Sequence, residues 1–216
     1  MGLAVLVVVA FLVGNLVRNL TAAGLLLTWS WLSNPAGFDI AESSIPYSAS
    51  QPYGMALLAG LVNTLKVVVV ALVGATLLGT GVGAAAFSSN GLLKRLARGY
   101  VELVRNIPLL LQLIFWYFVV FLALPNGASA IQLPGVVIAK SGLYLGWFSA
   151  GWHWQLPSLS DGVWQAPLRL SVEFSALLTG LVVYTAAFIA EVVRGGIAAV
   201  PQGQWEAARA LGLSPL

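Results

Sequence analysis

The stretch VVVVALVGATLLGTGVGAAAF, from Val67 to Phe87, contains no charged side chain. A helix needs about 20 predominantly apolar residues to cross a hydrocarbon layer about 30 Å thick, because each residue adds about 1.5 Å. The stretch has that length and predicts a membrane-spanning helix. The whole chain shares this character: 59% of its 216 residues are hydrophobic, 8% are charged, and the mean hydropathy is +0.92. Soluble domains have about 25% charged residues, so we expect a membrane protein.

Three further segments have similar length and apolarity, at about 2–20, 101–124 and 172–193. An amphipathic elbow, 55–66, precedes the span at 67–87. We therefore expect an all-α fold, a polytopic helical membrane protein with four spans in this chain. Two parts are expected: residues 1–54, with one transmembrane helix and an outer segment, and a core, 55–216.

The first span has two interpretations, a retained transmembrane helix or a cleaved signal peptide. Signal peptides carry basic residues before the apolar region and a small-residue cleavage site after it. Neither feature is present around residues 2–20. We favour a retained helix, which reaches the required length only if it begins at the first residues.

The orientation follows from one short loop. Residues 88–99 carry Lys94, Arg95 and Arg98 and no acidic side chain, which predicts a cytoplasmic loop by the positive-inside rule. Alternation then places the insertion 125–170 in the periplasm and the segment 197–216 in the cytoplasm. Arg18 would face outward, but a single residue is weaker evidence than the loop with three charges.

The outer insertion is rich in tryptophan. It contains Trp147, Trp152, Trp154 and Trp164, half of the 8 tryptophans in the chain. Tryptophan favours the membrane–water interface, where its ring is half buried and its N–H stays hydrated. The insertion is therefore either a cap resting on the bilayer or a docking surface for an external partner. His153 lies among these residues and fits an interfacial role.

Composition argues against several classes of function. The chain has no cysteine and one histidine, which leaves no disulfide, no thiol nucleophile and no histidine cluster for a metal. We therefore assign no catalytic residue, no metal site and no cofactor. The net charge of +3 is small and its basic residues are scattered, which indicates an orientation signal and no nucleic-acid surface.

Charged and polar residues inside the spans are expensive and need a reason. Glu102 with Arg105, and Glu191 with Arg194, lie three residues apart, so each pair shares one helix face. Either the pairs neutralise each other near the interface, or they line a pathway and brace an inner gate.

Two further polar or helix-breaking positions lie in the third span. Pro108 removes the helical donor of a carbonyl about one turn earlier, which causes either a harmless kink or a break that exposes backbone to a cavity. Gln112 then serves either as glue between helices or as a substrate contact. In the second span, Gly79, Gly81 and Gly83 form a small-residue face suited to close helix packing.

The last segment, PQGQWEAARALGLSPL from Pro201 to Leu216, predicts a short helix outside the membrane. Pro201 suits the start of a helix and Gly212 its end, and Ser214 before Pro215 predicts a second helix start. Residues Trp205, Ala208 and Leu211 share one face, and Glu206 can pair with Arg209. So short a helix needs a packing partner, and a soluble cytoplasmic protein is the obvious one. An amphipathic helix on the membrane is the alternative, although such helices usually carry more Lys and Arg.

At this point the motifs resemble a known family. Glu206-Ala207-Ala208 followed by Gly212 resembles the EAA loop of permease subunits of ABC importers. Two internal motifs resemble the polar amino-acid branch, which carries histidine, glutamate, glutamine or arginine: Glu102-x-x-Arg105-Asn106-x-Pro108-Leu109-Leu110-x-Gln112, and the run from Tyr184 to Ile197. Asn63-Thr64-Leu65 resembles it too. Ile45-Pro46-Tyr47-Ser48 and Gly142-Leu143-Tyr144-Leu145 resemble the general L-amino-acid permease type.

The resemblance implies the type I permease fold of ABC importers in the bacterial inner membrane, with two further spans beyond Leu216 and hence a C-terminally truncated chain. It implies an ATPase dimer, a second permease subunit that is identical or different, a periplasmic amino-acid-binding protein, an L-amino-acid substrate and the surrounding membrane lipid as partners. The expected ATPase-coupling residues are Trp205, Glu206, Ala207, Ala208, Arg209 and Gly212. The expected pathway or gate residues are Glu102, Arg105, Asn106, Pro108, Gln112, Glu191 and Arg194.

Other classes of membrane protein fit less well. The sequence lacks the phosphate-binding Gly-x-x-x-x-Gly-Lys-Ser/Thr motif, so a separate subunit would hydrolyse ATP. An ion-coupled secondary transporter would carry an ionisable residue near a span midplane, whereas these carboxylates lie near span ends. Only the family pattern argues against a non-transporting scaffold, and a membrane enzyme would need more reactive side chains.

Overall fold

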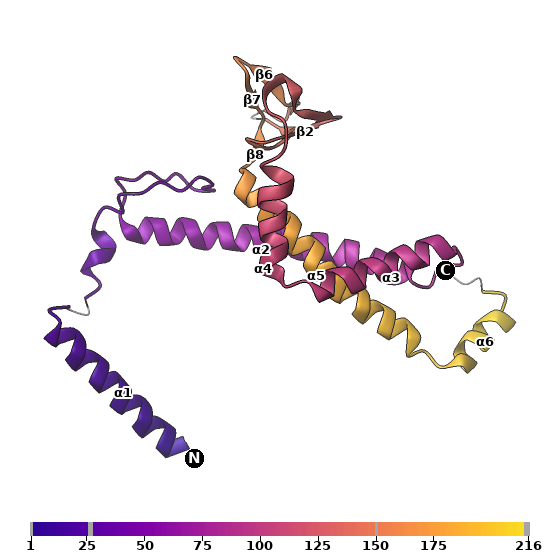
Figure 1. Cartoon of the computed structure of the whole chain (residues 1–216), viewed down its shortest axis with the longest axis horizontal. Coiled ribbons are helices and arrows are strands. Elements are labelled where there is room, and N and C mark those ends of the chain that lie inside the picture. Colours follow the sequence, from indigo (N-terminus) through magenta and orange to yellow (C-terminus); the bar gives the residue numbers. More distant parts are fainter. Residues whose placement is uncertain (1, 26–27, 150, 214–216) are drawn as a thin grey trace. The chain divides into compact units, whose positions relative to one another are not determined.

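The computed structural model describes residues 2–25, 28–149 and 151–213 (Figure 1). Its contacts divide the chain into two units, Met1–Val62 and Asn63–Leu216. Residues 214–216 lie outside the described residues. The second helix start expected at Ser214 and Pro215 is among them.

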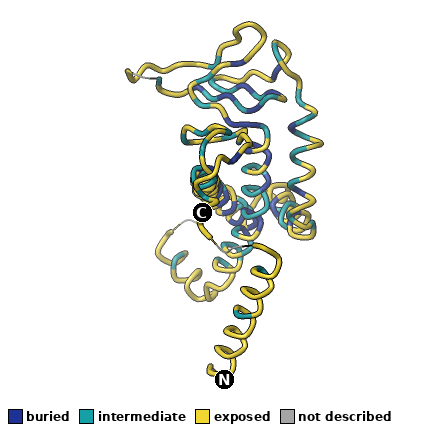
Figure 2. Tube along the Cα trace, turned by 90° about the vertical axis from the view of Figure 1, so that its left-hand side faces the viewer, coloured by how far each residue is buried: buried dark blue, intermediate teal, exposed yellow. Residues whose placement is uncertain are grey.

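The N-terminal unit contains an apolar helix, α1 (Gly2–Ala22), and a short 3-10 turn, η1 (Ser30–Ser33). None of the described residues of α1 is buried, as its yellow trace in Figure 2 shows. Between η1 and α2, Tyr47 of the Ile-Pro-Tyr-Ser motif donates a hydrogen bond to the Phe38 carbonyl at 2.9 Å. Its ring also packs near that of Phe38.

The fold is mostly helical, as expected for a polytopic membrane protein. Three described helices are long and apolar enough to cross a membrane: α1, α2 (Tyr53–Ala85) and α5 (Val172–Ala198). A fourth span arises if α3 (Gly91–Asn106) and the helix after it count as one bent pair. The elbow expected at 55–66 is continuous with α2 and does not form a separate element.

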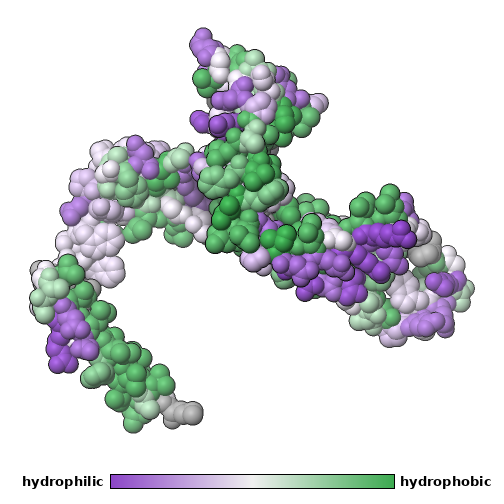
Figure 3. All heavy atoms as spheres, in the orientation of Figure 1, coloured by the Kyte–Doolittle hydropathy of each residue, from purple (hydrophilic) through white to green (hydrophobic). Residues whose placement is uncertain are grey.

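The third span, expected at 101–124 with either a kink or a break at Pro108, is broken there. Ile107 and Pro108 adopt extended backbone and end α3. Helix α4 (Leu109–Ile114) then continues into the π-helix η2 (Phe115–Phe121), and the two halves meet at 105°. The cause is Pro108, which lacks the N–H that would continue the helix and disfavours helical backbone in the residue before it. Figure 3 shows hydrophobic side chains over α4 and hydrophilic ones along α3.

Helices α2 and α5 approach each other closely through glycine and alanine. A Cβ atom built on Gly79 would lie 2.7 Å from the Ala186 carbonyl oxygen, and one on Gly83 would lie 2.8 Å from the Ala190 carbonyl oxygen. Ala186 and Ala190 are buried on the α5 side. A Cβ on Gly81 meets nothing within 4 Å. The Gly79-x-x-x-Gly83 pattern therefore places two backbones in contact, and Gly81 has no part in this contact.

The insertion 125–170 contains strands, whereas the sequence predicted an all-α fold. The bounds are β1 (Ile131–Leu133), β2 (Val136–Ala139), β3 (Gly142–Leu145), β4 (Trp147–Phe148), β5 (Trp154–Gln155), β6 (Ser158–Ser160), β7 (Val163–Gln165) and β8 (Leu168–Leu170), after a 3-10 turn η3 (Gly127–Ser129).

Four of the strands form an antiparallel sheet in the order β1-β2-β3-β8, and β4-β5 and β6-β7 are separate hairpins. A small core of Val137, Ala139, Tyr144 and Trp164 holds the insertion together. The Trp164 ring nitrogen donates to the Gly127 carbonyl at 2.8 Å. Figure 2 shows the buried residues concentrated in this sheet and in the helices that carry it.

The closing segment forms the expected short helix, α6 (Gln202–Ala210). Gly212 follows it with φ 75°. The Gly212 N–H donates to the Arg209 carbonyl at 3.0 Å, and the Leu213 N–H donates to the Ala208 carbonyl at 3.1 Å. These two bonds form a Schellman motif, which ends a helix at a glycine in the left-handed region.

Candidate functional site

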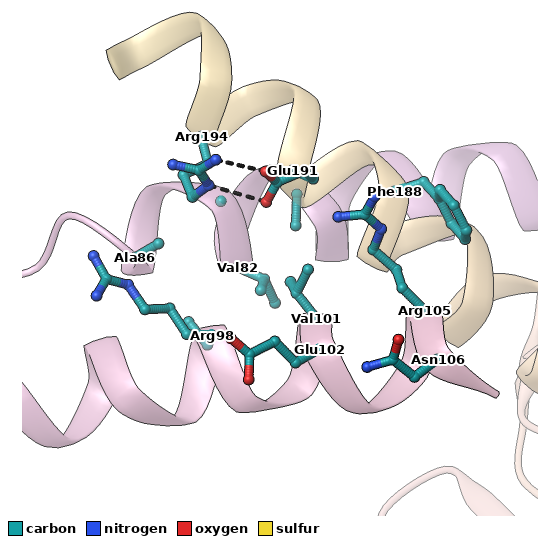
Figure 4. Close-up of a pocket in the computed structure, with 13 residues that line it drawn as sticks. Val82, Ala86, Arg98, Val101, Glu102, Arg105, Asn106, Phe188, Glu191 and Arg194 are labelled. Atoms are coloured by element: carbon teal, nitrogen blue, oxygen red, sulfur yellow. Dashed lines mark hydrogen bonds and ion pairs between the residues drawn. The ribbon is translucent and has the colours of Figure 1, made fainter.

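A cavity of about 610 Å³ lies where α2, α3 and α5 meet (Figure 4). Glu191 and Arg194 project into it from α5, and Arg98, Glu102 and Arg105 project from α3. Small and apolar residues form the remaining wall: Val82, Gly83, Ala86, Ala97, Val101, Phe188 and Ala190, with Asn106 at one end. The close approach of α2 at Gly83 thus supplies one side of the same cavity.

Five of the seven residues expected to form a pathway or gate line this cavity: Glu102, Arg105, Asn106, Glu191 and Arg194. Pro108 and Gln112, both described, are not among its lining residues. Arg98 also lines the cavity, although the sequence predicts for it only a part in the cytoplasmic orientation signal. Its spacing of four residues from Glu102, which places both on one helix face, is the signal that could have identified it.

The two expected ion pairs differ in the structure. The Arg194 guanidinium donates through Nε to Glu191 Oε2 at 2.9 Å and through Nη2 to Glu191 Oε1 at 2.5 Å. Arg105 instead lies over the Phe188 ring, 5.3 Å from its centroid, and the described side chains of Glu102 and Arg105 form no ion pair with each other. Because Phe188 belongs to α5, the Arg105 contact connects α3 to α5.

Electrostatically the cavity favours ions over apolar ligands. It contains three guanidinium groups and two carboxylates, a net charge of +1 (3 − 2). Only one of these carboxylates, Glu191, is engaged in an ion pair that the structure records. Among the described residues, no group of three His, Cys, Asp or Glu side chains could hold a metal ion. The three guanidinium groups and two carboxylates can therefore form ion pairs with one another or with a charged ligand.

Gln112 supports the bend between α3 and α4. Pro108 leaves the Val104 carbonyl without its helical donor, and the Gln112 amide Nε2 donates to that carbonyl at 2.8 Å. The same nitrogen donates to the Ile107 carbonyl at 2.9 Å. The side chain is buried, with 7% of its surface exposed. Of the two roles considered for Gln112, these bonds favour packing between helices over contact with a substrate.

A tyrosine also ties α3 to α5. The Tyr100 hydroxyl donates to the Val183 carbonyl at 2.6 Å, in a partly buried position. Together with Arg105 over Phe188, this bond fixes the rotation of α3 about its own axis. The charged face of α3 is thereby held toward the cavity.

We predict that Gln112→Met lowers the melting temperature of the detergent-solubilised protein by about 2–10 °C. The buried Val104 carbonyl and the partly buried Ile107 carbonyl both lose the hydrogen bond from the Gln112 amide, at about 1–3 kcal/mol. Melting followed by size-exclusion chromatography measures this. Leu110→Met on the same helix, 67% exposed, is the matched control and should leave the temperature unchanged. An unchanged melting temperature, with a raised KM for transport, would instead assign Gln112 to the substrate.

The expected coupling residues lie together on α6 and its stop. Trp205, Glu206, Ala207, Ala208 and Arg209 belong to the helix, and none of the described residues of α6 is buried. Trp205 is 40% exposed and Leu211, just after the helix, is 80% exposed. The described side chains of Glu206 and Arg209 do not form the expected ion pair. An exposed helix with a large ring on one face provides a surface for another molecule.

Comparisons with known proteins relate most of the chain to one family. Residues 75–216 match the family model described as "Binding-protein-dependent transport system inner membrane component". The chain is 33% identical, over 97% of its length, to the "Putative amino-acid ABC transporter permease protein YhdX" of Escherichia coli, 69% of which it covers. It is 34% identical, over 93% of its length, to the "General L-amino acid transport system permease protein AapQ" of Rhizobium johnstonii, 64% of which it covers.

One solved structure is also similar. A "Crystal structure of an amino acid ABC transporter with histidines" matches 75% of this chain and 55% of its own chain at 26% identity, with a TM-score of 0.48. The chain therefore spans about half of that structure's chain and about two thirds of the curated relatives, at 69% and 64% of their lengths.

Proposed function

The chain belongs to the family of binding-protein-dependent transport system inner membrane components, and we propose that it is the permease subunit of an ATP-driven importer that moves L-amino acids from the periplasm to the cytoplasm. The substrate class follows the names of its relatives, which include amino-acid and general L-amino acid permease proteins. The whole importer's activity is part of the proposal, since the chain spans only part of those relatives.

Helix α6 carries the proposal. It follows a membrane-spanning helix, it presents Glu206-Ala207-Ala208 with Gly212 at its stop, and none of its described residues is buried. In the proposed mechanism this helix docks into a groove of the separate ATPase subunit. The Schellman stop at Gly212 keeps it short and rigid, so that closure of the ATPase dimer moves α6 as a lever and α5 with it.

The charged cavity is the proposed inner gate. An ATPase can shift the equilibrium between inward-open and outward-open states only through contacts that differ between the two. Movement of α5 relative to α3 would break and remake the contact of Arg105 with Phe188 and would carry the Glu191–Arg194 pair past Glu102 and Arg98. Each state can then satisfy a different set of the same charges. Asn106 lies at one end of this cavity (Figure 4), two residues before Pro108 in the chain.

The required partners are a dimer of ATPase subunits, a second permease subunit and a periplasmic amino-acid-binding protein. Purification of the complete gene product from native membranes in mild detergent tests the assembly. We expect an ATPase to copurify, and ATP hydrolysis in proteoliposomes to drive uptake of amino acids only when the binding protein is present. Purification of the permease with no ATPase attached, or uptake driven by an ion gradient alone, would overturn the proposal.

A further inference from the structure

The two hairpins of the outer insertion expose opposite kinds of side chain. In β6-β7, Trp164 is buried and the turn presents Asp161, with φ 50°, to solvent. In β4-β5, Trp147, Phe148, Trp152 and Trp154 are all exposed, at 56%, 46%, 84% and 56%. The tryptophan of the β6-β7 hairpin is therefore buried, whereas the four aromatic side chains of the β4-β5 hairpin are exposed.

The exposed rings form one cluster centred on Phe148. Its centroid lies 6.4 Å from that of Trp147, 5.8 Å from Trp152 and 5.3 Å from Trp154. The turn is closed by the Ser149 N–H donating to the His153 carbonyl at 2.9 Å, and by the Trp152 N–H donating to the Ser149 carbonyl at 3.0 Å. The cluster is therefore held by hydrogen bonds and ring contacts of the hairpin's own residues.

Trp152 is displayed at a conformational cost. Its φ is 60°, in the left-handed region that bulky residues seldom adopt and that costs about 1–3 kcal/mol. A ring that is 84% exposed recovers little of this cost by packing within the chain. Strained positions that persist are concentrated at sites of interaction, which indicates that the ring packs against something outside the chain.

The hairpin is rooted close to the bilayer surface. Helix α5 has 27 residues, a length of about 40 Å, which matches a bilayer of about 40–45 Å including its headgroups. Its N-cap, Ser171, directly follows β8, and Leu170 of β8 pairs with Leu143 of β3. Trp147 is four residues further along the chain, a reach of about 14 Å in extended backbone. The aromatic cluster is thus within reach of the lipid headgroups.

We propose that the β4-β5 hairpin is a membrane anchor whose aromatic cluster inserts into the interface of the outer leaflet. Lipid fits this surface better than a protein does because no Asp, Glu, Lys or Arg occurs from Ser141 to Ser160, whereas protein docking surfaces have a polar rim and use charges for steering. Tryptophan has the matching preference for the membrane–water interface. The anchor would hold the sheet, and with it the outer end of α5, at a constant height above the membrane.

The chain has no cysteine, so single cysteines can report on each hairpin without background. We would label Trp152→Cys with an environment-sensitive fluorophore and reconstitute the protein in liposomes of phosphatidylethanolamine and phosphatidylglycerol. Asp161→Cys is the matched control, since it occupies the same backbone conformation at the turn of the other hairpin. Phe148→Cys is a second reporter in case the first variant fails to fold.

At positions 152 and 148 we expect several-fold stronger quenching by a lipid carrying a shallow quencher, and several-fold weaker quenching by aqueous iodide, than at position 161. The three variants are reconstituted identically, so random orientation of the protein in the liposomes affects the iodide quenching of all three alike. Equal exposure to iodide at positions 152 and 161 would overturn the anchor. Shielding of position 152 that arises only when the periplasmic binding protein is added would also overturn it, in favour of a protein dock.

Discussion

Glu206→Lys is expected to abolish amino-acid uptake by the complete importer while leaving the protein in the membrane and the ATPase active. Glu206 is exposed on α6, where none of the described residues is buried, so the change costs the permease itself little stability. In the proposed complex this carboxylate is covered by the ATPase groove. Replacing it with a cation there costs about 2–5 kcal/mol, because it leaves the partner's group unpaired.

The measurement compares uptake of a radiolabelled amino acid with ATP hydrolysis in the same proteoliposomes, with immunoblotting of the permease. Gln204→Lys is the control, since at about 100° per residue it lies almost opposite Glu206 on the helix. It should keep both activities. Normal uptake by Glu206→Lys would show that α6 does not couple the permease to the ATPase. Loss of the protein from the membrane would show that Glu206 is needed for folding.

The stop of α6 can be tested separately. Gly212 has φ 75° and a Cβ built there meets nothing within 4 Å, so its constraint is backbone conformation and not space. Gly212→Arg should therefore reduce coupling through strain in the helix stop, and Gly212→Asn, which tolerates this region better, should retain most of the uptake. Equal uptake by the two variants would show that the Schellman motif is dispensable for coupling.

The motifs were sufficient to identify the family, and the match of residues 75–216 confirms it. Span positions were also predictable in outline, because hydrocarbon thickness sets a minimum length for any apolar helix. Pro108 predicts that a carbonyl one turn earlier loses its helical donor. The direction in which the chain then turns depends on which group replaces that donor. Extended backbone at Ile107 follows from Pro108 itself, whereas the bonds of the Gln112 amide to the Val104 and Ile107 carbonyls depend on how the chain turns and are not specified by a single sequence.

The outer strands were missed for a different reason. Strands of two to four residues, such as Trp147–Phe148 and Gly142–Leu145, are too short for an alternating pattern to stand out from chance. Composition also predicts a single interfacial role for all four tryptophans of the insertion. The structure divides them, because Trp164 is buried and donates to the Gly127 carbonyl, while Trp147, Trp152 and Trp154 remain exposed.

Gly79→Leu is expected to prevent α2 and α5 from packing. A side chain needs a Cβ, and at Gly79 that atom would lie 2.7 Å from both the Ala186 carbonyl oxygen and the Ile189 Cβ. Neither neighbour can rotate away, because one is backbone and the other is the branched first atom of its side chain. The helices must separate, and overpacking of this kind costs about 1–3 kcal/mol or more.

Gly81→Leu provides a control that differs by half a turn of the same helix. Both changes add the same apolar surface and remove the same unfavourable helix propensity of glycine, but a Cβ at Gly81 meets nothing within 4 Å. We expect Gly79→Leu to lower the melting temperature of the solubilised chain by at least about 5 °C, and Gly81→Leu to leave it unchanged or raise it. Equal melting temperatures would mean that α2 and α5 are not in backbone contact.

The same contact bears on the transport cycle, because the Gly83 end of it forms a wall of the charged cavity. In the proposed cycle α5 moves with α6 against α2, and the small residues at their contact let the two backbones lie close together. A variant that separates the helices should therefore lose uptake together with stability. Glu206→Lys, in contrast, should lose uptake while keeping its stability. Comparing uptake and melting temperature in the two variants therefore separates disrupted packing of α2 against α5 from lost docking of α6.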